Sequence, residues 1–160
     1  HVRSRRQRQM CIRDRHLDLP DSIILDIKNS IAKPGELPYF QLTPIRKPTL
    51  KTKFDQLRNS GVVMMIGTDS GIPMKFHSQS TWNELEVWVN VFNVEPLDAI
   101  KSATYWPSFF MGVSDKVGTI SVGKQADIIA VKGNVLKHIS TLQNVDIVMK
   151  KGKIYKNTKS

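Results

Sequence analysis

Five consecutive apolar residues, Val62 to Ile66, constrain the fold of this 160-residue chain more than any other feature. An unbroken apolar run is typical of a strand that is buried on both faces, as in a parallel sheet covered by helices. A helix is predicted before the run, from Thr49 to a stop at Asn59, and the polar, glycine-flanked stretch 67–71 follows it. The order helix, buried strand and polar loop predicts an α/β unit whose polar groups lie at the carboxyl end of the strand.

Three further helices are expected around this strand. The first covers residues 21–32, where Asp21 or Ser22 can cap it, and the proline-rich stretch up to Pro48 is expected to be a long loop. The next opens at Thr81, because Thr81 to Glu84 has capping-box spacing. The last opens at Pro96 and continues to about Tyr105. The helices from Thr49, Thr81 and Pro96 each have an apolar stripe, formed in that order by Leu50, Phe54 and Leu57, by Leu85, Trp88, Val89 and Phe92, and by Leu97, Ile100, Ala103 and Thr104.

The pattern changes to short β segments from Val113 onward. Strands are predicted at 117–120, 126–131, 145–150 and 153–155, and Lys151-Gly152 forms a two-residue hairpin connection. The chain is therefore predicted to be α/β first and a small β-sheet second.

A basic arm precedes this body. The first fifteen residues contain six of the 24 basic residues and one of the 14 acidic ones, which is half of the net charge of +10. One interpretation is a flexible arm that binds nucleic acid through its phosphates. The interpretation we favour comes from Met10 to Asp14, which can be written ATG TGT ATA AGA GAC. This resembles the mosaic end of a transposase-based sequencing adapter, and residues 5–15 continue the match. Residues 1–15 are therefore expected to be an adapter-derived, disordered artefact that includes Cys11.

Five separated segments of the chain carry a resemblance to a known family. They are GVVMMIGTDSG, HSQSTWNELE, EPLDAIKSAT, MGVSDKVGTISVGKQADIIAVKGN and VDIVMKKGKIY. In this order they resemble the carboxyl-terminal part of the amidohydrolase superfamily, in its branch of imidazolonepropionase-like and Xaa-Pro dipeptidase-like metal hydrolases. The resemblance implies the C-terminal part of a (β/α)8 TIM barrel over residues 16–112, with Val62 to Ile66 as the eighth strand. Strands of a small β-sandwich are implied over residues 113–160.

Asp69 matches the family's aspartate at the end of the eighth strand. There it is implied to be a metal ligand and the general base that takes a proton from a metal-bound water. A divalent metal, zinc by resemblance, lowers the pKa of such a water toward roughly 7, and a nearby carboxylate can accept the proton. The implied reaction is hydrolysis of a C–N bond in a cyclic amide, a dipeptide or a related small molecule. The competing interpretation is a turn residue, because Asp, Ser and Gly are common in turns.

Other residues are placed near the substrate by the same resemblance. His77 lies in the loop after Asp69, where this branch often carries a histidine, and an exposed loop histidine is an equally good interpretation. Ser70 and Gly71 are expected to line the pocket by position. Glu84 belongs to the family's ELE segment, and capping explains it adequately.

The remaining metal ligands of the family have no counterpart here. The family pattern needs a His-x-His, a metal-bridging lysine or glutamate and two further histidines. The chain has four histidines and no His-x-His: His1, His16, His77 and His138. A complete barrel needs roughly 250 residues, and a catalytic zinc usually takes three protein ligands and a water. We therefore expect a fragment of a longer hydrolase that is inactive by itself.

Three other interpretations stay open. The chain can be a non-catalytic relative that retains only the fold, or a nucleic-acid-binding module that uses the basic arm. The stretch 69–73 also resembles the nucleophile loop of trypsin-like serine proteases, with Ser70 as the nucleophile. However, Thr68 stands where that loop has a glycine, and the predicted helices contradict an all-β fold.

A small-molecule or dipeptide substrate is the expected partner, with no nucleic acid. Insertion into a membrane is not expected, because no run approaches the roughly 18 apolar residues that a spanning helix needs. A homo-oligomer of the complete enzyme stays open, and so does the compartment, cytoplasmic or exported.

Overall fold

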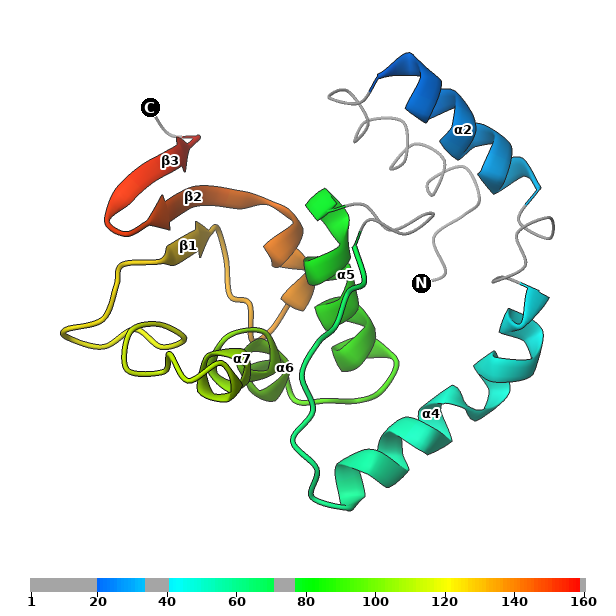
Figure 1. Ribbon diagram of the computed structural model, residues 1–160, viewed down its shortest axis with the longest axis horizontal. Coiled ribbons are helices and arrows are strands. Elements are labelled where there is room, and N and C mark those ends of the chain that lie inside the picture. The colour runs from blue at the N-terminus through cyan, green and yellow to red at the C-terminus, as the bar shows by residue number, and fades with distance from the viewer. Residues whose placement is uncertain (1–19, 34–40, 71–76, 159–160) are drawn as a thin grey trace. The chain divides into compact units, whose positions relative to one another are not determined.

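The computed structural model describes residues 20–33, 41–70 and 77–158, in which helices are followed by a small antiparallel sheet (Figure 1). Contacts divide the chain into two compact units, residues 1–48 and 49–160. None of the helices in the described ranges has both the length and the apolar character of a bilayer-spanning segment. The basic arm, residues 1–15, lies outside the described residues. The division into barrel and sandwich parts after residue 112 stays a prediction.

The first unit contains helix α2, Asp21–Ala32, and these are the bounds that the sequence predicts. The N-cap residue is Pro20, and no side chain caps the helix, so the expected capping by Asp21 or Ser22 is wrong. The carbonyl of Pro20 accepts a hydrogen bond from the N–H of Ile24 at 3.1 Å. The proline ring holds φ at −56° with an extended ψ, so the backbone alone sets the direction in which this helix starts.

Helix α4 covers Thr43–Asn59 and therefore begins earlier than Thr49, the predicted start. The predicted loop is wrong from residue 43 onward. Pro44 lies in the first turn, where the missing N–H of a proline costs no helical hydrogen bond. Pro48 lies inside the helix and removes one such bond. The boundary between the two units falls directly after this proline.

The hydrophobic core of the second unit is built around three aromatic rings from α4 and from α5, His77–Asn90, and its C-terminal end. The ring of Phe54 stacks on that of Phe92 with centroids 4.2 Å apart and meets Trp88 edge-on at 5.1 Å. The other buried hydrophobic members are Leu85, Val94, Ala99 and Ile139. Burial of Leu85, Trp88 and Phe92 confirms the stripe predicted for α5, whereas Leu50 and Leu57 on α4 are exposed.

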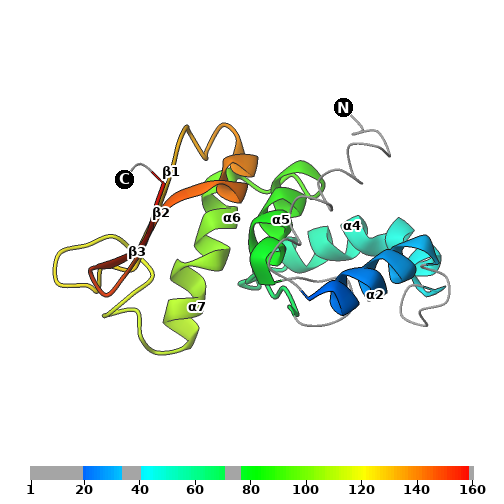
Figure 2. The same cartoon turned by 90° about the horizontal axis from the view of Figure 1, so that it is seen from above.

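Helix α6, Pro96–Ala103, starts with Pro96 as predicted and lies beside α5 (Figure 2). The predicted stripe is confirmed for Ile100 and Ala103, which pack against the core, but the most deeply buried residues of this helix are others. Ala99 and Ser102 are 0% and 1% exposed, whereas Leu97 is 51% exposed. Small side chains allow close approach of neighbouring elements, which hydrophobicity alone does not register. The separate short helix α7, Tyr105–Phe110, follows directly.

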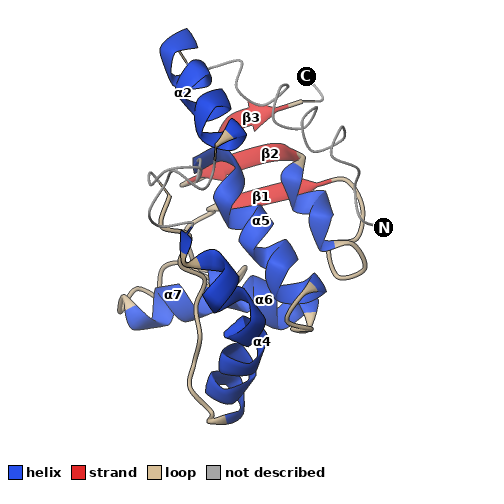
Figure 3. Ribbon diagram, turned by 90° about the vertical axis from the view of Figure 1, so that its right-hand side faces the viewer, coloured by secondary structure: helices blue, strands red, loops and turns tan. Residues whose placement is uncertain are grey.

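The sheet has the order β1-β2-β3, with β1 at Ile128–Val131, β2 at Val145–Lys150 and β3 at Lys153–Asn157 (Figure 3). All pairings are antiparallel. Lys151 and Gly152 have φ values of 50° and 78°, which confirms the two-residue hairpin. The predicted strand at 117–120 is wrong, because this stretch forms bends around Gly118.

Gly118 explains why no strand forms there. Its φ is 93°, outside the β region. A Cβ at this position would lie 2.6 Å from the Cβ of Ser108 on α7. The loop therefore approaches α7 more closely than any residue with a side chain allows.

Asp127 directly precedes β1, and its side chain connects this end of the strand to the β2–β3 hairpin. Its carboxylate accepts hydrogen bonds from the Nζ of Lys150 at 2.7 Å and from the backbone N–H of Lys151 at 2.7 Å. The hydrogen bond from Lys150, followed by that from the Lys151 amide, lowers the pKa of Asp127 below its ordinary value. The ionised carboxylate thus stabilises the folded state above the unfolded pKa, and this contribution is lost as the pH falls through the folded pKa.

We expect Asp127→Asn to lower the melting temperature at neutral pH, because asparagine carries no charge to hold Lys150. The difference from the wild type should shrink as the pH falls below the ordinary pKa of an aspartate and through the lowered pKa of Asp127, where the wild-type carboxylate becomes protonated. Thermal melts followed by circular dichroism across this range measure it. Asp115→Asn, at an exposed position, is the matched control. A difference that does not change with pH contradicts the assignment.

Candidate functional site

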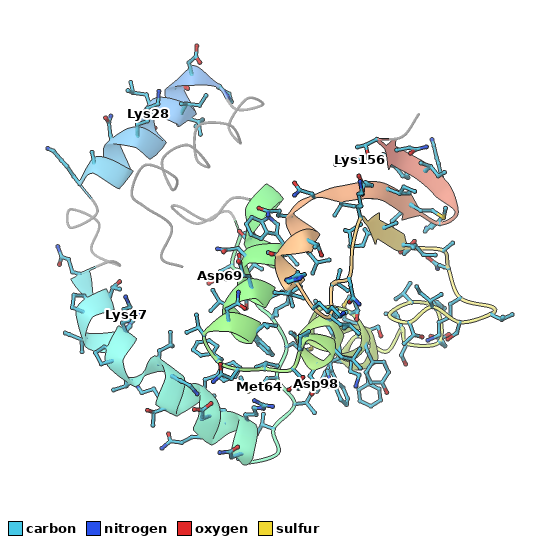
Figure 4. The ribbon with its side chains drawn as sticks, turned by 180° about the vertical axis from the view of Figure 1, so that it is seen from behind. Lys28, Lys47, Met64, Asp69, Asp98 and Lys156 are labelled. Carbon is cyan, nitrogen blue, oxygen red and sulfur yellow. The ribbon has the colours of Figure 1, made fainter. Side chains whose placement is uncertain are left out.

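The segment 62–70, which follows α4 in the sequence and precedes α5, carries Asp69 near its C-terminal end (Figure 4). No strand forms at 62–66, so the predicted buried strand is wrong for the described structure. A parallel strand needs hydrogen-bonded neighbours along its edges, and among the described residues β1 to β3 form a three-stranded sheet that does not include 62–66. The N–H of Ile66 instead donates to the carbonyl of Ser102 on α6 at 3.3 Å.

Burial nevertheless alternates from Val63 to Ser70 with the period of an extended chain, and Val62 before it is 56% exposed. One side is half-buried and the other is exposed; the half-buried residues are Met64, Ile66, Thr68 and Ser70, and the exposed ones are Val63, Met65, Gly67 and Asp69. Met64 and Ile66 pack against the hydrophobic core. The core therefore covers Met64 and Ile66 on one face of the apolar run, and the second face is uncovered within the described structure.

Asp69 has an unusual backbone conformation. Its φ of 51° lies in the left-handed region, which non-glycine residues rarely enter and which aspartate tolerates better than most. The hydroxyls of Thr68 and Ser70, on either side of it, are 2.9 Å apart. The Asp69 side chain is exposed, and it makes no hydrogen bond or ion pair with the residues that the structure describes. Its carboxylate oxygens are thus accessible as proton acceptors or ligands.

Glu84 is the residue at this site that the sequence did not identify. Its Oε1 accepts a hydrogen bond from the backbone N–H of Gly67 at 3.0 Å. The predicted capping box is wrong, because α5 begins at His77 and both Thr81 and Glu84 lie inside the helix. The ELE segment of the family was a signal for this residue, but capping accounted for it equally well.

Of the remaining predicted site residues, the structure describes the side chain of Ser70 but not that of His77, and Gly71 is not described. Ser70 is half-buried and contacts Thr68 through its hydroxyl. The predicted loop position of His77 is wrong, because His77 is the first residue of α5, and its side chain is not among the described ones. Gly71 lies outside the described residues. The structure thus places the hydroxyls of Thr68 and Ser70 on either side of Asp69 and connects Glu84 to Gly67, two residues before it, and leaves His77 and Gly71 as predictions.

A metal centre made by this chain requires several ligands near Asp69. Within the ranges that the structure describes, no group of three or more His, Cys, Asp or Glu residues could hold a metal ion. A catalytic zinc usually takes three protein ligands. The described residues, taken by themselves, therefore do not fit a complete metal site.

Comparison with known proteins shows similarity to imidazolonepropionases. The chain is 36% identical to the imidazolonepropionase of Shewanella oneidensis over 81 residues, which is 51% of this chain and 20% of that protein. It is 35% identical to that of Shewanella baltica over the same length. The chain spans about a fifth of the length of these curated relatives.

The chain is also similar in fold and sequence to solved structures of prolidase-type proteins. A Xaa-Pro dipeptidase with methionine bound in its active site superposes with a TM-score of 0.63 and 37% identity, over 69% of this chain and 26% of that one. A prolidase-like protein from Bifidobacterium longum superposes with a TM-score of 0.58 and 28% sequence identity, over 62% of this chain and 24% of that one. Residues 46–155 match the Amidohydrolase family, which is more than half of the chain. The chain therefore belongs to the amidohydrolase family.

Proposed function

We propose that this chain is the carboxyl-terminal part of a metal-dependent hydrolase that cleaves a C–N bond in a small molecule, with Asp69 as the general base. The observation that carries this proposal is the Asp69 carboxylate, exposed in a left-handed turn at the end of segment 62–70. This segment lies inside the stretch that matches the Amidohydrolase family. A carboxylate in such a position can take a proton from an attacking water.

The exposure of the second face of the apolar run supports the inference that further strands pack beside it in the complete protein. We infer that Val62 to Ile66 is the eighth strand of a (β/α)8 barrel and that neighbouring strands cover the face of Val63 and Met65, which are 39% and 40% exposed here. β1 to β3 are in this proposal part of the small β-sandwich. The similarity to a Xaa-Pro dipeptidase over 69% of the chain supports the assignment.

The proposed metal, a divalent ion such as zinc, would make the attacking water more acidic when bound. Its ligands would come largely from outside the described residues, because these supply Asp69 alone. Within this chain the assigned role is acceptance of a proton at the Asp69 carboxylate. Ser70, Gly71 and His77 are proposed to face the substrate.

Two substrate classes follow from the named relatives. Imidazolonepropionase points to a cyclic amide, and the Xaa-Pro dipeptidase points to a dipeptide that ends in proline. We also propose that the complete enzyme binds no nucleic acid. A non-catalytic relative of the fold is the alternative that the experiment below distinguishes.

The test is to read the genomic DNA upstream of the codon for His16, express the complete protein and assay it against both substrate classes. Hydrolysis of one class is expected, with loss of activity in a metal chelator and recovery on addition of zinc. The same assay on the 160-residue chain alone is the control and should show no turnover. Absence of hydrolysis by the metal-supplied complete protein in both classes would favour the non-catalytic relative.

A further inference from the structure

We infer that Glu84 is a positioning residue for Asp69, acting through the backbone N–H of Gly67. This inference extends the proposed function, since it names the group that holds the general base in place. Two consecutive amides precede the Asp69 turn, and both donate hydrogen bonds to helices. The N–H of Ile66 donates to the Ser102 carbonyl on α6 at 3.3 Å, and the N–H of Gly67 donates to Glu84 Oε1 on α5 at 3.0 Å.

These two hydrogen bonds connect the end of segment 62–70 to two different helices. Consecutive amides of an extended chain point in opposite directions, so a single neighbouring element cannot satisfy both. One acceptor is a backbone carbonyl, whose position is set by α6 itself. The other acceptor is a side chain, so of these two hydrogen bonds only the one to Glu84 is lost when the acceptor residue is substituted by alanine.

The helices that provide the acceptors are themselves firmly placed. Leu85, next to Glu84, is 4% exposed, and Trp88, one turn further along α5, is 8% exposed. Ser102 is 1% exposed, and its hydroxyl donates to the Ala99 carbonyl at 2.7 Å. Both acceptors are therefore held by packed elements, which a loop residue could not achieve.

Asp69 needs such support because its own conformation is strained. A non-glycine residue at a φ of 51° is disfavoured relative to the right-handed region, because its Cβ approaches the following carbonyl oxygen. Such a conformation persists when the surrounding contacts determine it. The Gly67 hydrogen bond lies two residues before Asp69, and the hydroxyl contact of Thr68 with Ser70 at 2.9 Å spans it. Glu84 thus anchors the turn from the helix side.

A carboxylate is well suited to this role. Hydrogen bonds to charged acceptors are stronger than those between neutral groups. Glutamine retains an Oε1 acceptor at the same place, whereas alanine has none. The pair Glu84→Gln and Glu84→Ala therefore separates the hydrogen bond from the bulk of the side chain, and Glu86→Ala, at another half-buried glutamate of α5, is the matched control.

The first measurement is amide hydrogen exchange of the isotope-labelled 160-residue chain. We expect exchange at Gly67 to become about tenfold faster or more in Glu84→Ala, to stay within roughly threefold of the wild type in Glu84→Gln and to be unchanged in Glu86→Ala. The N–H of Val94, which donates to the Trp88 carbonyl at 3.0 Å, reports on the core and should exchange at the wild-type rate in all variants. Unchanged exchange at Gly67 in Glu84→Ala, or equal acceleration at Val94, would overturn the proposal.

The second measurement uses the complete enzyme. In Glu84→Ala we expect kcat to fall about tenfold or more with KM nearly unchanged, and Glu84→Gln should restore most of kcat. Wild-type kcat in Glu84→Ala would overturn the positioning role even if Gly67 exchanges faster. A wild-type complete protein without any turnover contradicts the proposed function instead, and the exchange experiment then decides alone whether Glu84 holds the Asp69 turn.

Discussion

Asp69→Asn in the complete enzyme is expected to lower kcat by about 10²- to 10⁴-fold, the usual contribution of a general base. The asparagine amide has the same size as the carboxylate but cannot take a proton from water at neutral pH. Asparagine is also suited to the left-handed backbone of this position. The folded state should therefore be retained, and the loss of rate would report on chemistry. Steady-state kinetics together with a thermal melt measure both quantities.

Asp98→Asn is the matched control for that variant. Asp98 lies in the first turn of α6 and pairs with Lys101 on the same helix at 3.3 Å, with 57% of its side chain exposed. An exposed pair of this kind contributes little to stability, and no contact connects it to Asp69. Its turnover should be close to that of the wild type. Turnover of Asp69→Asn near the wild-type value would count decisively against Asp69 as the base.

Phe92→Ala is expected to have the largest effect on stability. Phe92 is 7% exposed, and its ring stacks on Phe54 at 4.2 Å in the aromatic centre of the core. Truncation of a buried phenylalanine to alanine removes apolar contacts and leaves a cavity, which costs about 3–5 kcal/mol. This is a large fraction of the roughly 5–15 kcal/mol by which domains are stable. Urea denaturation of the 160-residue chain gives the free energy of unfolding.

Phe110→Ala makes the same chemical change at an exposed site. Phe110, at the end of α7, is 58% exposed, and substitutions at such positions usually change stability by about 0.5 kcal/mol or less. The difference between the two variants therefore measures burial rather than residue type. Equal destabilisation by both would mean that the three-ring cluster is not the centre of the core.

The elements that were predicted correctly are those determined by neighbouring residues. Helix α2 has the predicted bounds, β2 coincides with residues 145–150, and the Lys151-Gly152 turn has the expected positive φ values. Each of these depends on periodicity or turn chemistry within a few residues. The same kind of reasoning wrongly predicts a loop at residues 43–48. The prolines there lie in the first turn of α4 and inside it, and they are tolerated because the rest of the helix forms.

The candidate site was only partly predictable for a different reason. Asp69 could be identified from its place after an apolar run and from the family segments. Glu84 could not, because its partner is the amide of Gly67, 17 residues away in the sequence, and nothing in a glutamate at helical spacing distinguishes a loop anchor from a capping or solvated residue. The buried face of α6 shows the same limit, since Ala99 and Ser102 are buried and the more apolar Leu97 is not.

The sequence by itself determined the bounds of helix α2 and strand β2, the turn at Lys151-Gly152, and that Asp69 follows an apolar run. These properties arise from short-range sterics and hydrogen bonding, which each segment carries with it. The tertiary structure alone decided that Met64 and Ile66 pack against the core and that Glu84 and Ser102 hold the amides of Gly67 and Ile66 before Asp69. Strand pairing and side-chain anchoring join residues far apart along the chain, so they exist only once the helices have packed.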